Sequence, residues 1–401
     1  MEFIGTVVIY IIMACAVAGA IASLRSTSEG LGKEFFEGIY SMGPIFVPVA
    51  GIMASIPYLA AAVESAVGPL FAIIGADPSI AATSIIAVDM GGYHLAEALA
   101  ATTDDWLMAM VVGYMAGATI VFSIPVGLAM LDKTDHQYMG LGIMSGILSV
   151  PIGVFITMVI MTGVGLEVRD VVSTTAEATH VYSLAIGAIL MNLAPLIVFC
   201  VAIAAGLWLV PRAMITGFLW FGKILYGAIT LVLVASIVEY FTGFFSMVFG
   251  VWGFDPIIAD EEDQFRALEI AGYIAIMLAG AFPMVYLIKK YLARPLDMIG
   301  TRVGLQSTGA AGILATFANV IALFRLVGDM RAKDKVLTIA FAVCAAFLFG
   351  DHLAFTANFQ PTMILPLLLG KLGGGIAAFL IAMKLSVPTA ERIEAERKQR
   401  G

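Results

Sequence analysis

The sequence predicts an all-α polytopic membrane protein, and three observations indicate this fold class. Hydrophobic residues make up 61% of the 401 residues and charged residues only 12%, whereas soluble domains average about 45–50% and about 25%. The mean hydropathy is +1.00. Many apolar runs reach the roughly 20 residues that a helix needs to cross a hydrocarbon core, and none shows the alternation of a membrane β-strand. We therefore expect one helical membrane domain.

The membrane segments can be read in order along the chain. Nine runs are long enough to span a membrane: 3–24, 39–62, 106–131, 137–163, 182–210, 215–238, 267–288, 303–324 and 361–383. Three more are short or interrupted: 66–76, 78–100 and 336–350. Together they predict about ten or eleven membrane segments. The first run is not a signal peptide, because its first basic residue, Arg25, follows the apolar stretch.

Charged loops predict an orientation. Two basic clusters flank the last helices: Lys289, Lys290, Arg294 and Arg302, and then Arg392, Arg397, Lys398 and Arg400. By the positive-inside rule both clusters are cytoplasmic. The acidic stretch 255–263, the 164–181 connection and the N-terminus are then external. We expect a membrane domain over residues 1–384 and a cytoplasmic tail over residues 385–401.

The alternation of sides fails in two places. A single crossing over 66–100 puts the following helices on the wrong sides, and the basic stretch 325–335 creates the same problem. A re-entrant hairpin or a broken helix in each region restores the alternation. Such irregular backbone is tolerated at membrane depth only where it is buried in protein or lines a polar cavity.

A short motif occurs twice, which suggests an internal duplication. Residues 91–96 read GGYHLA and residues 349–354 read FGDHLA; upstream, AGIMAS at 50–55 is matched by AGILAT at 311–316. The two pairs follow one another at nearly equal spacing. We predict repeat units near 40–130 and 300–383, either parallel or inverted. Paired interrupted helices of this kind form the substrate sites of many transporters.

Ionisable residues follow a glycine pair in the first unit. Asp89 precedes Gly91 and Gly92, which allow an unwound turn, and His94 and Glu97 then lie three residues apart on one helix face. A carboxylate at membrane depth costs at least about 2.5–3.5 kcal/mol unless it has a partner or water. Asp89 therefore either binds a cationic ligand or caps the following helix. Glu97 is either a site residue or an exposed helix end.

The second unit carries a related but different set. Asp351 and His352 follow Gly350, and Asn358 lies further along the same segment. Asp351 aligns with Tyr93 and not with Asp89, so the two carboxylates are not equivalent, which suits one asymmetric ligand. A plain Asp351–His352 pair is the alternative. The histidines either sense pH or donate hydrogen bonds between helices.

Further polar and aromatic residues accompany the first unit. Thr119 and Ser123 interrupt the apolar stretch TIVFSIPVG. Tyr93, Trp106, Tyr114 and Phe122 are close enough in sequence to Asp89 to form a cation–π wall, although an interface position explains Trp106 equally well.

Several classes of protein are excluded. The chain has no HExxH, P-loop or CxxC motif, and the contexts of Asp89 and Asp351 do not match an intramembrane aspartyl protease. We expect no enzyme activity, no catalytic residues, no cofactor and no metal site. The three cysteines lie within apolar runs and predict no disulfide. A net charge of −8 disfavours nucleic acid and favours a cationic solute.

Three strings together resemble the ethanolamine utilisation permease (EutH) family. They read VDMGG at 88–92, TIVFSIPVG at 119–127 and AFAVCAAFLFGDHLAFTA at 340–357, and RLVGDMRAKDKV at 325–336 extends the likeness. The resemblance covers most of the chain. It implies a transport domain that takes up ethanolamine across the bacterial inner membrane and supplies a cytoplasmic ammonia-lyase pathway. It does not imply which residues bind the substrate.

Ethanolamine fits the ionisable residues. It carries one ammonium and one hydroxyl, so its site needs a carboxylate or aromatic face and a polar group for the hydroxyl. We predict a substrate site built from the following residues: Asp89, Gly91, Gly92, Tyr93, His94, Glu97, Thr119, Ser123, Gly350, Asp351, His352 and Asn358. We expect Asp89 to bind the ammonium, Asp351 and His352 to act as counter-charge or as a pH-linked partner, and Asn358 to bind the hydroxyl.

The sequence leaves other questions open. Facilitated diffusion, proton symport and sodium symport all fit it, as does carriage of the neutral amine. A permease for a related amine or amino acid and a non-transporting membrane scaffold are the alternatives. The expected partners are a small-molecule substrate and the lipid bilayer, and homo-oligomerisation is left open.

Overall fold

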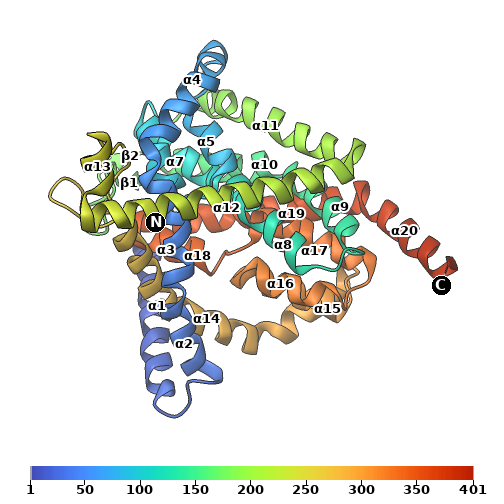
Figure 1. The fold of residues 1–401 in the computed structure, drawn as a ribbon. Coiled ribbons are helices and arrows are strands. Elements are labelled where there is room, and N and C mark those ends of the chain that lie inside the picture. Colours follow the sequence, from blue (N-terminus) through green and yellow to red (C-terminus); the bar gives the residue numbers. More distant parts are fainter. Residues whose placement is uncertain (1, 401) are drawn as a thin grey trace.

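The computed structural model describes residues 2–400 and is almost entirely helical (Figure 1). Residues 1 and 401, which begin and end the predicted domain ranges, lie outside the described residues. One two-stranded antiparallel ribbon, β1 (Glu167–Val168) with β2 (His180–Val181), accounts for the strands among residues 2–400. The predicted all-α polytopic class is confirmed.

Elements in the first part of the chain are the following: α1 (Glu2–Ser23), α2 (Gly30–Tyr40), α3 (Met42–Ala54), α4 (Ile56–Ile74), α5 (Ser79–Ile85), η1 (Val88–Met90), α6 (Gly92–Leu99), α7 (Thr103–Val112), η2 (Gly113–Ser123), α8 (Ile124–Met130), α9 (His136–Ile147) and α10 (Val150–Val164). The second part contains α11 (Ile186–Leu209), α12 (Pro211–Thr242), α13 (Phe244–Phe249), α14 (Ala267–Arg302), α15 (Ser307–Ala318), α16 (Val320–Val327), α17 (Ala332–Ala345), α18 (Asp351–Phe359), η3 (Pro361–Met363), α19 (Ile364–Leu385) and α20 (Val387–Arg400).

Nine helical segments among residues 2–400 are long and apolar enough to cross a membrane. The predicted ten or eleven differ because three apolar runs fold in another way. The runs 78–100 and 303–324 each fold into a pair of short helices. The run 336–350 contains the break between α17 and α18. Run length alone therefore predicts membrane crossings where the chain instead folds into two hairpins and a broken helix.

A helical hairpin occupies the first region where the predicted alternation failed. Its arms are α5 and α6, and η1 forms its tip. The carboxylate of Asp77 closes the base, because it accepts hydrogen bonds from the N–H groups of Ser79 (2.9 Å) and Ala101 (2.8 Å). The side chain of Asn192 in turn accepts from the Asp77 N–H at 2.7 Å. A buried carboxylate thus holds together two ends of one re-entrant unit.

A second hairpin, formed by α15 and α16, is closed in the same manner. The fully buried Asp334 accepts hydrogen bonds from the Gln306 N–H (3.0 Å) and from Nε of Arg331 (3.0 Å). Next to it, Nζ of Lys335 donates to Asp135 at 2.6 Å. This base therefore lies beside the start of α9. The first base lies beside the far end of α10, because Asp104 at the start of α7 binds the N–H of Ser183 at 3.0 Å.

A similar order of elements occurs in the two halves. Apolar helices precede a hairpin, then an interrupted helix, then a further long helical segment: α2–α3 and α4, α5–α6, α7–η2–α8 and α9–α10 in one half, and α14, α15–α16, α17–α18 and α19 in the other. Helix α4 has no counterpart in the second half. The quoted motif pairs do not occupy matching elements of this order. Gly51 lies in α3 and Gly312 in a hairpin arm, whereas His94 lies in a hairpin arm and His352 in an interrupted helix.

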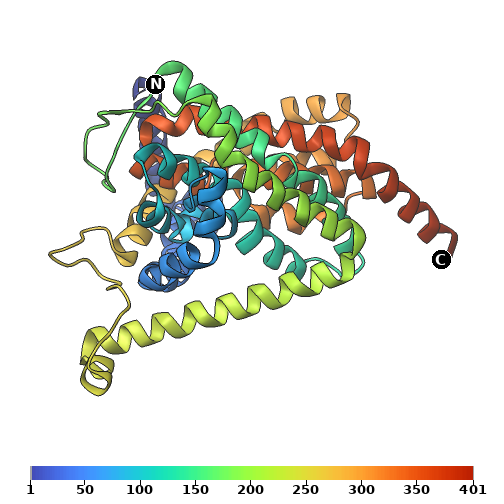
Figure 2. The same cartoon turned by 90° about the horizontal axis from the view of Figure 1, so that it is seen from above.

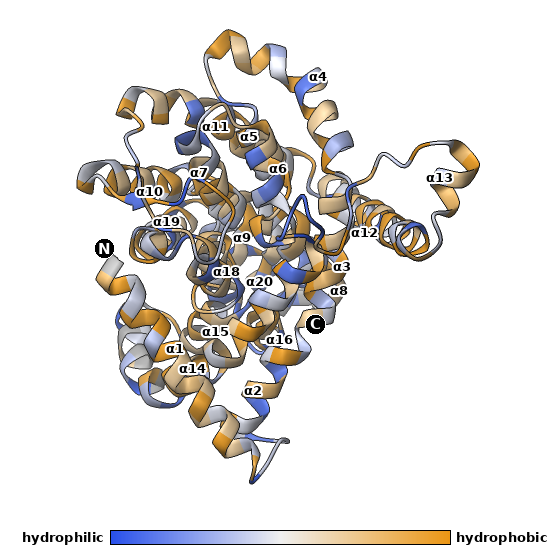
Figure 3. Cartoon of the chain, turned by 90° about the vertical axis from the view of Figure 1, so that its left-hand side faces the viewer, coloured by the Kyte–Doolittle hydropathy of each residue, from blue (hydrophilic) through white to orange (hydrophobic). Residues whose placement is uncertain are grey.

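The interrupted helix α7–η2–α8 forms the centre of the molecule, since nearly all its residues are buried. Around it, α1, α4, α11 and α12 expose large apolar side chains such as Trp208, Trp220 and Leu231. Figure 3 shows these outer helices largely in the hydrophobic colour. Figure 2 shows α12 along one edge of the molecule and α20 extending away from it. Apolar side chains in these positions face lipid at no cost.

The closed base of the second hairpin generates a prediction about stability. Replacing Asp334→Ala leaves the partly buried N–H of Gln306 and the Arg331 guanidinium without their acceptor, which costs about 1–3 kcal/mol. We expect a clear drop in the unfolding midpoint of the purified protein in detergent. Asp329→Ala removes the same charge from an exposed neighbouring turn and serves as the control; equal midpoints for the two variants would contradict this role.

Candidate functional site

The first hairpin turns sharply at its tip because of a glycine. Gly91 adopts φ +95°, a conformation that side chains rarely allow. A Cβ there would lie 2.8 Å from Ile52 of α3. The tip therefore packs directly against α3, and Asp89 lies on it. The structure has a helix break at Gly91 and Gly92, as predicted, since α6 begins at Gly92.

The second break separates α17 from α18. Phe347 has φ +62°, a left-handed conformation that costs a non-glycine residue about 1–3 kcal/mol. Two backbone hydrogen bonds hold it, from the N–H of Phe347 to the Thr316 carbonyl (3.1 Å) and from the N–H of Phe349 to the Phe317 carbonyl (2.9 Å). Gly350 packs on the carbonyl of Ala318. The end of α15, at the tip of the second hairpin, thus supplies partners for a helix broken in the protein interior.

One cavity lies where these two breaks meet. Its volume is about 70 Å³, which is room for a few water-sized groups. Asp89 from η1 and Asp351 and His352 from the start of α18 face it. The remaining lining residues are mostly apolar: Pro44, Ile45, Pro48, Ala87, Met90, Ala118, Phe122 and Phe347. The structure therefore unites three of the predicted site residues from sequence positions about 260 residues apart.

The two carboxylates in this cavity are unpaired. Within residues 2–400 the Asp89 carboxylate contacts only its own backbone N–H, and Asp351 has no hydrogen-bond partner. Neither caps a helix: the position before α6 is Gly91, the position before α18 is Gly350, and no side chain caps either helix. Asp89 therefore caps no helix in the structure, and Asp351 forms no hydrogen-bonded pair with His352. Both carboxylates are free to accept hydrogen bonds from a ligand.

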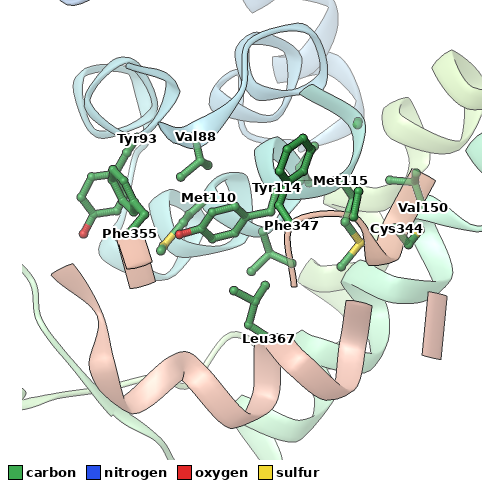
Figure 4. Packing of buried hydrophobic residues seen from close by; sticks show 14 of the residues in the cluster. Val88, Tyr93, Met110, Tyr114, Met115, Val150, Cys344, Phe347, Phe355 and Leu367 are labelled. Atoms are coloured by element: carbon green, nitrogen blue, oxygen red, sulfur yellow. The ribbon is translucent and has the colours of Figure 1, made fainter. Parts of the chain in front are cut away.

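A buried lysine that the sequence interpretation missed completes the cluster. Nζ of Lys371 in α19 donates to Nδ1 of His352 (2.9 Å) and to the carbonyl of Tyr114 (3.0 Å). Because an ammonium only donates, Nδ1 accepts, and the neutral imidazole carries its proton on Nε2. The hydroxyl of Tyr114 bonds Thr356 at 2.7 Å. Figure 4 shows Tyr114 between Phe355 and Phe347 in the packed core.

Formal charges in the cluster do not cancel. Asp89 and Asp351 carry two negative charges, and Lys371 supplies one positive charge. One negative charge is left over beside a small cavity, which is the balance that a monovalent cation would complete. Lys371 was detectable in the sequence, since it is the lone charge within the apolar run 361–383, and such residues are functional candidates by default.

Other predicted site residues do not line this cavity. Thr119 donates to the Val343 carbonyl (3.2 Å) and Ser123 to that of Ala118 (3.2 Å), so each hydroxyl is bonded to backbone. The Tyr93 hydroxyl accepts from Gln360 at 3.0 Å. Asn358 donates to the carbonyls of Ala354 (2.9 Å) and Tyr273 (3.1 Å). The geometry corrects the hydroxyl-binding role predicted for Asn358, which joins α18 to α14.

His94 and Glu97 face a different, larger cavity of about 280 Å³. Asp255, Asp263 and Arg266 from the loop before α14 also line it. The predicted site is thus divided between two cavities. The predicted aromatic wall is reduced to Phe122, joined by Phe347, because Tyr93, Trp106 and Tyr114 line neither cavity. The part of the chain that the structure describes contains no group of three or more residues suited to hold a metal ion.

The fold and this site together define a class of protein. The part of the chain that the structure describes combines nine apolar helical segments, two hairpins and a cavity with ionisable residues between two helix breaks, which is the arrangement of a multi-pass membrane transporter. Residues 4–385 match the family described as "Ethanolamine utilisation protein, EutH", and the chain belongs to this family. The predicted family is thereby confirmed.

Individual relatives agree with this assignment. The "Probable ethanolamine permease EutH" of Listeria monocytogenes is 38% identical over 384 residues, which are 96% of this chain and 94% of that protein. Its Escherichia coli namesake is 38% identical over 92% of this chain and 89% of that protein. The "Uncharacterized protein YxeR" of Bacillus subtilis is 35% identical over 92% of both chains. The two EutH names denote permeases and not enzymes. No solved structure matches.

The lysine cluster generates a prediction. Lys371→Met leaves the Tyr114 carbonyl and His352 Nδ1 without a donor and the two carboxylates without a counter-charge, which costs about 1–3 kcal/mol or more. We expect a lower unfolding midpoint in detergent. Adding Asp351→Asn to this variant removes one of the two uncompensated charges and should recover part of the loss.

Lys384→Met is the matched control, because Lys384 lies exposed at the end of the same helix. An unchanged midpoint in Lys371→Met, or a double variant less stable than either single one, would show that charge balance does not govern this cluster.

Proposed function

We propose that the protein is a permease for ethanolamine that binds the ammonium form in the cavity between Asp89 and Asp351. The observation that carries the proposal is the pair of unpaired carboxylates beside a neutral imidazole and a built-in cation. The names of the relatives support ethanolamine as the substrate. Ethanolamine has four non-hydrogen atoms, which suits a cavity of about 70 Å³.

Each polar group of the substrate has a partner in this proposal. The ammonium donates to the carboxylates of Asp89 and Asp351 and completes the charge balance with Lys371. The hydroxyl accepts from Nε2 of His352, which faces the cavity from the start of α18. Phe122 and Phe347 present aromatic faces to the cation. Gly91, Gly92 and Gly350 contribute to the site indirectly, because they permit the helix breaks next to which the ionisable residues face the cavity.

The repeated order of elements supports the internal duplication. The two units are wider than the predicted 40–130 and 300–383, because they include the helices before the hairpins and after the interrupted helices. The hairpin bases lie at opposite ends of α9–α10, since one contacts the residue before α9 and the other the loop after α10. This arrangement favours an inverted repeat whose hairpin tips meet near the middle of the membrane.

We place the C-terminus and the basic loops in the cytoplasm by the positive-inside rule. The ribbon β1–β2 and the acidic loop 250–266 then face outward. Because the relatives are bacterial, the membrane in question is the bacterial inner membrane. Uptake brings ethanolamine from the acidic loop toward α20.

Counterflow in proteoliposomes tests the proposal without an ion gradient. We expect wild type to exchange labelled ethanolamine, and Asp89→Asn and Asp351→Asn to lower the exchange rate at sub-saturating substrate at least about tenfold. The loss of one charge-assisted hydrogen bond, about 1.5–3 kcal/mol, accounts for that factor. Asp132→Asn, at an exposed position, is the control and should exchange as wild type does.

Three outcomes would contradict the proposal. Full exchange by both variants would remove the carboxylates from the site, and exchange that survives in Asp89→Asn and rises with pH would make the neutral amine the substrate. Exchange absent from wild type, with and without imposed proton or sodium gradients, would favour a scaffold. Choline should compete poorly, because its quaternary ammonium has no N–H to donate and exceeds the cavity.

A further inference from the structure

The larger cavity lies between the first hairpin and the loop before α14. Its walls include Met53 near the end of α3, Ile56 at the start of α4, His94 and Glu97 of α6, and the loop residues Asp255, Asp263 and Arg266. The loop is attached firmly at this point, because the N–H of Asp255 donates to the carbonyl of Ala54 at 2.9 Å. Phe254 also packs on Tyr58, with ring centroids 4.7 Å apart. The cavity is therefore built from fixed elements.

His94 has no hydrogen-bond partner in this cavity. Its side chain is 8% exposed, and neither Nδ1 nor Nε2 contacts a polar group of residues 2–400. A buried imidazole normally satisfies at least one ring nitrogen, and leaving both without a partner is unfavourable. A polar ligand in the adjoining cavity would supply the missing partner.

Carboxylates in the cavity exceed the cations. Arg266 lies 3.3 Å from Asp260 and 3.6 Å from Asp263, so its charge is used within the loop. Glu97 and Asp255 face the same cavity without an ion pair in the described part of the chain. Burial raises the pKa of the Asp255 carboxyl, the Arg266 guanidinium opposes this shift, and the carboxylates of Asp263 and Asp260 add to it.

The set of polar groups matches that of the inner cavity. Each cavity combines two unpaired carboxylates with one imidazole, and each imidazole comes from the duplicated motif, two residues after the glycine at a helix break. The two cavities also lie in series along α3. Pro48 lines the inner cavity and Met53 the outer one, and five residues of helix span only about 7–8 Å.

We propose that the cavity of His94, Glu97 and Asp255 is an outer binding site for a small primary ammonium ion, which loads the inner cavity. This proposal rests on the proposed function. The carboxylates of Glu97 and Asp255 accept from the ammonium, and the imidazole of His94 bonds the hydroxyl. The contact of Gly91 with Ile52 and Met53 separates the two sites, so the solute passes from one to the other when the hairpin tip moves away from α3.

Imidazole NMR tests the outer site directly. The chain has four histidines, so ¹⁵N-histidine labelling of the purified protein in detergent gives few resonances, which single His→Gln variants assign. Titration with ethanolamine should shift the His94 resonances in a saturable manner. Glu97→Gln and Asp255→Asn should weaken that response, whereas Glu262→Gln, an exposed acid of the same loop outside the cavity, should not.

Counterflow supplies the second measurement. We expect Glu97→Gln and Asp255→Asn to raise the ethanolamine concentration for half-maximal exchange roughly two- to fivefold, as for the loss of one partly exposed ion pair. The maximal rate should stay as in wild type, and Glu262→Gln should change neither quantity.

The outcomes separate this inference from the proposed function. A saturable shift of His352 without one of His94 overturns the outer site and leaves the inner one standing. A His94 shift without a His352 shift supports the outer site and contradicts the proposed inner site. A His94 shift that is equal in the Glu97→Gln, Asp255→Asn and Glu262→Gln variants contradicts binding by these carboxylates.

Discussion

Backbone polar groups exposed by two helix breaks are the constraint on which this structure depends. A broken turn in apolar surroundings must give its N–H and carbonyl groups to another part of the chain. Here two carbonyls at the tip of one hairpin accept hydrogen bonds from the break of α17–α18, and the tip of the other packs on η2 through Gly117, where a Cβ would clash with the Ile86 carbonyl. Asp77 and Asp334 close the hairpin bases. The hairpins supply the contacts that the helix breaks require in an apolar interior. The breaks in turn leave a cavity with polar groups inside the protein.

In the proposed function, electrostatics makes that cavity selective for a small cation. Placing two carboxylates in a largely apolar interior is unfavourable unless positive charge compensates them. Lys371 compensates one, and its bonds to His352 and to the Tyr114 carbonyl hold it in place. The remaining charge attracts a cation, while the small volume excludes bulky ones. Because Lys371 already compensates one carboxylate, the protein without substrate lacks one positive charge and not two. This limits the electrostatic free-energy cost of the unloaded state.

Much of the fold was predictable, and the reasons for the rest are physical. Composition and run length gave the fold class, and the failed alternation of sides located the first hairpin. Segment length could not distinguish a crossing from a hairpin, because both arms of a hairpin are apolar. Asp89, Asp351 and His352 were found because charge is rare in such segments. Asn358, Thr119 and Ser123 are equally polar, but their hydrogen bonds to backbone are visible only in three dimensions. Both copies of the repeated motif lie where a helix begins after a break, but the motif did not show that His94 and His352 face separate cavities.

The central claim is that positive charge, and not the hydroxyl, secures the solute between Asp89 and Asp351. Equilibrium displacement of labelled ethanolamine tests it most directly, in purified protein that carries Glu97→Gln and Asp255→Asn so that only the inner site remains intact. Ethylammonium, which has the charge without the hydroxyl, should displace the label, and ethylene glycol, which has hydroxyls without charge, should not. Displacement by ethylene glycol as effective as that by ethylammonium would contradict the claim.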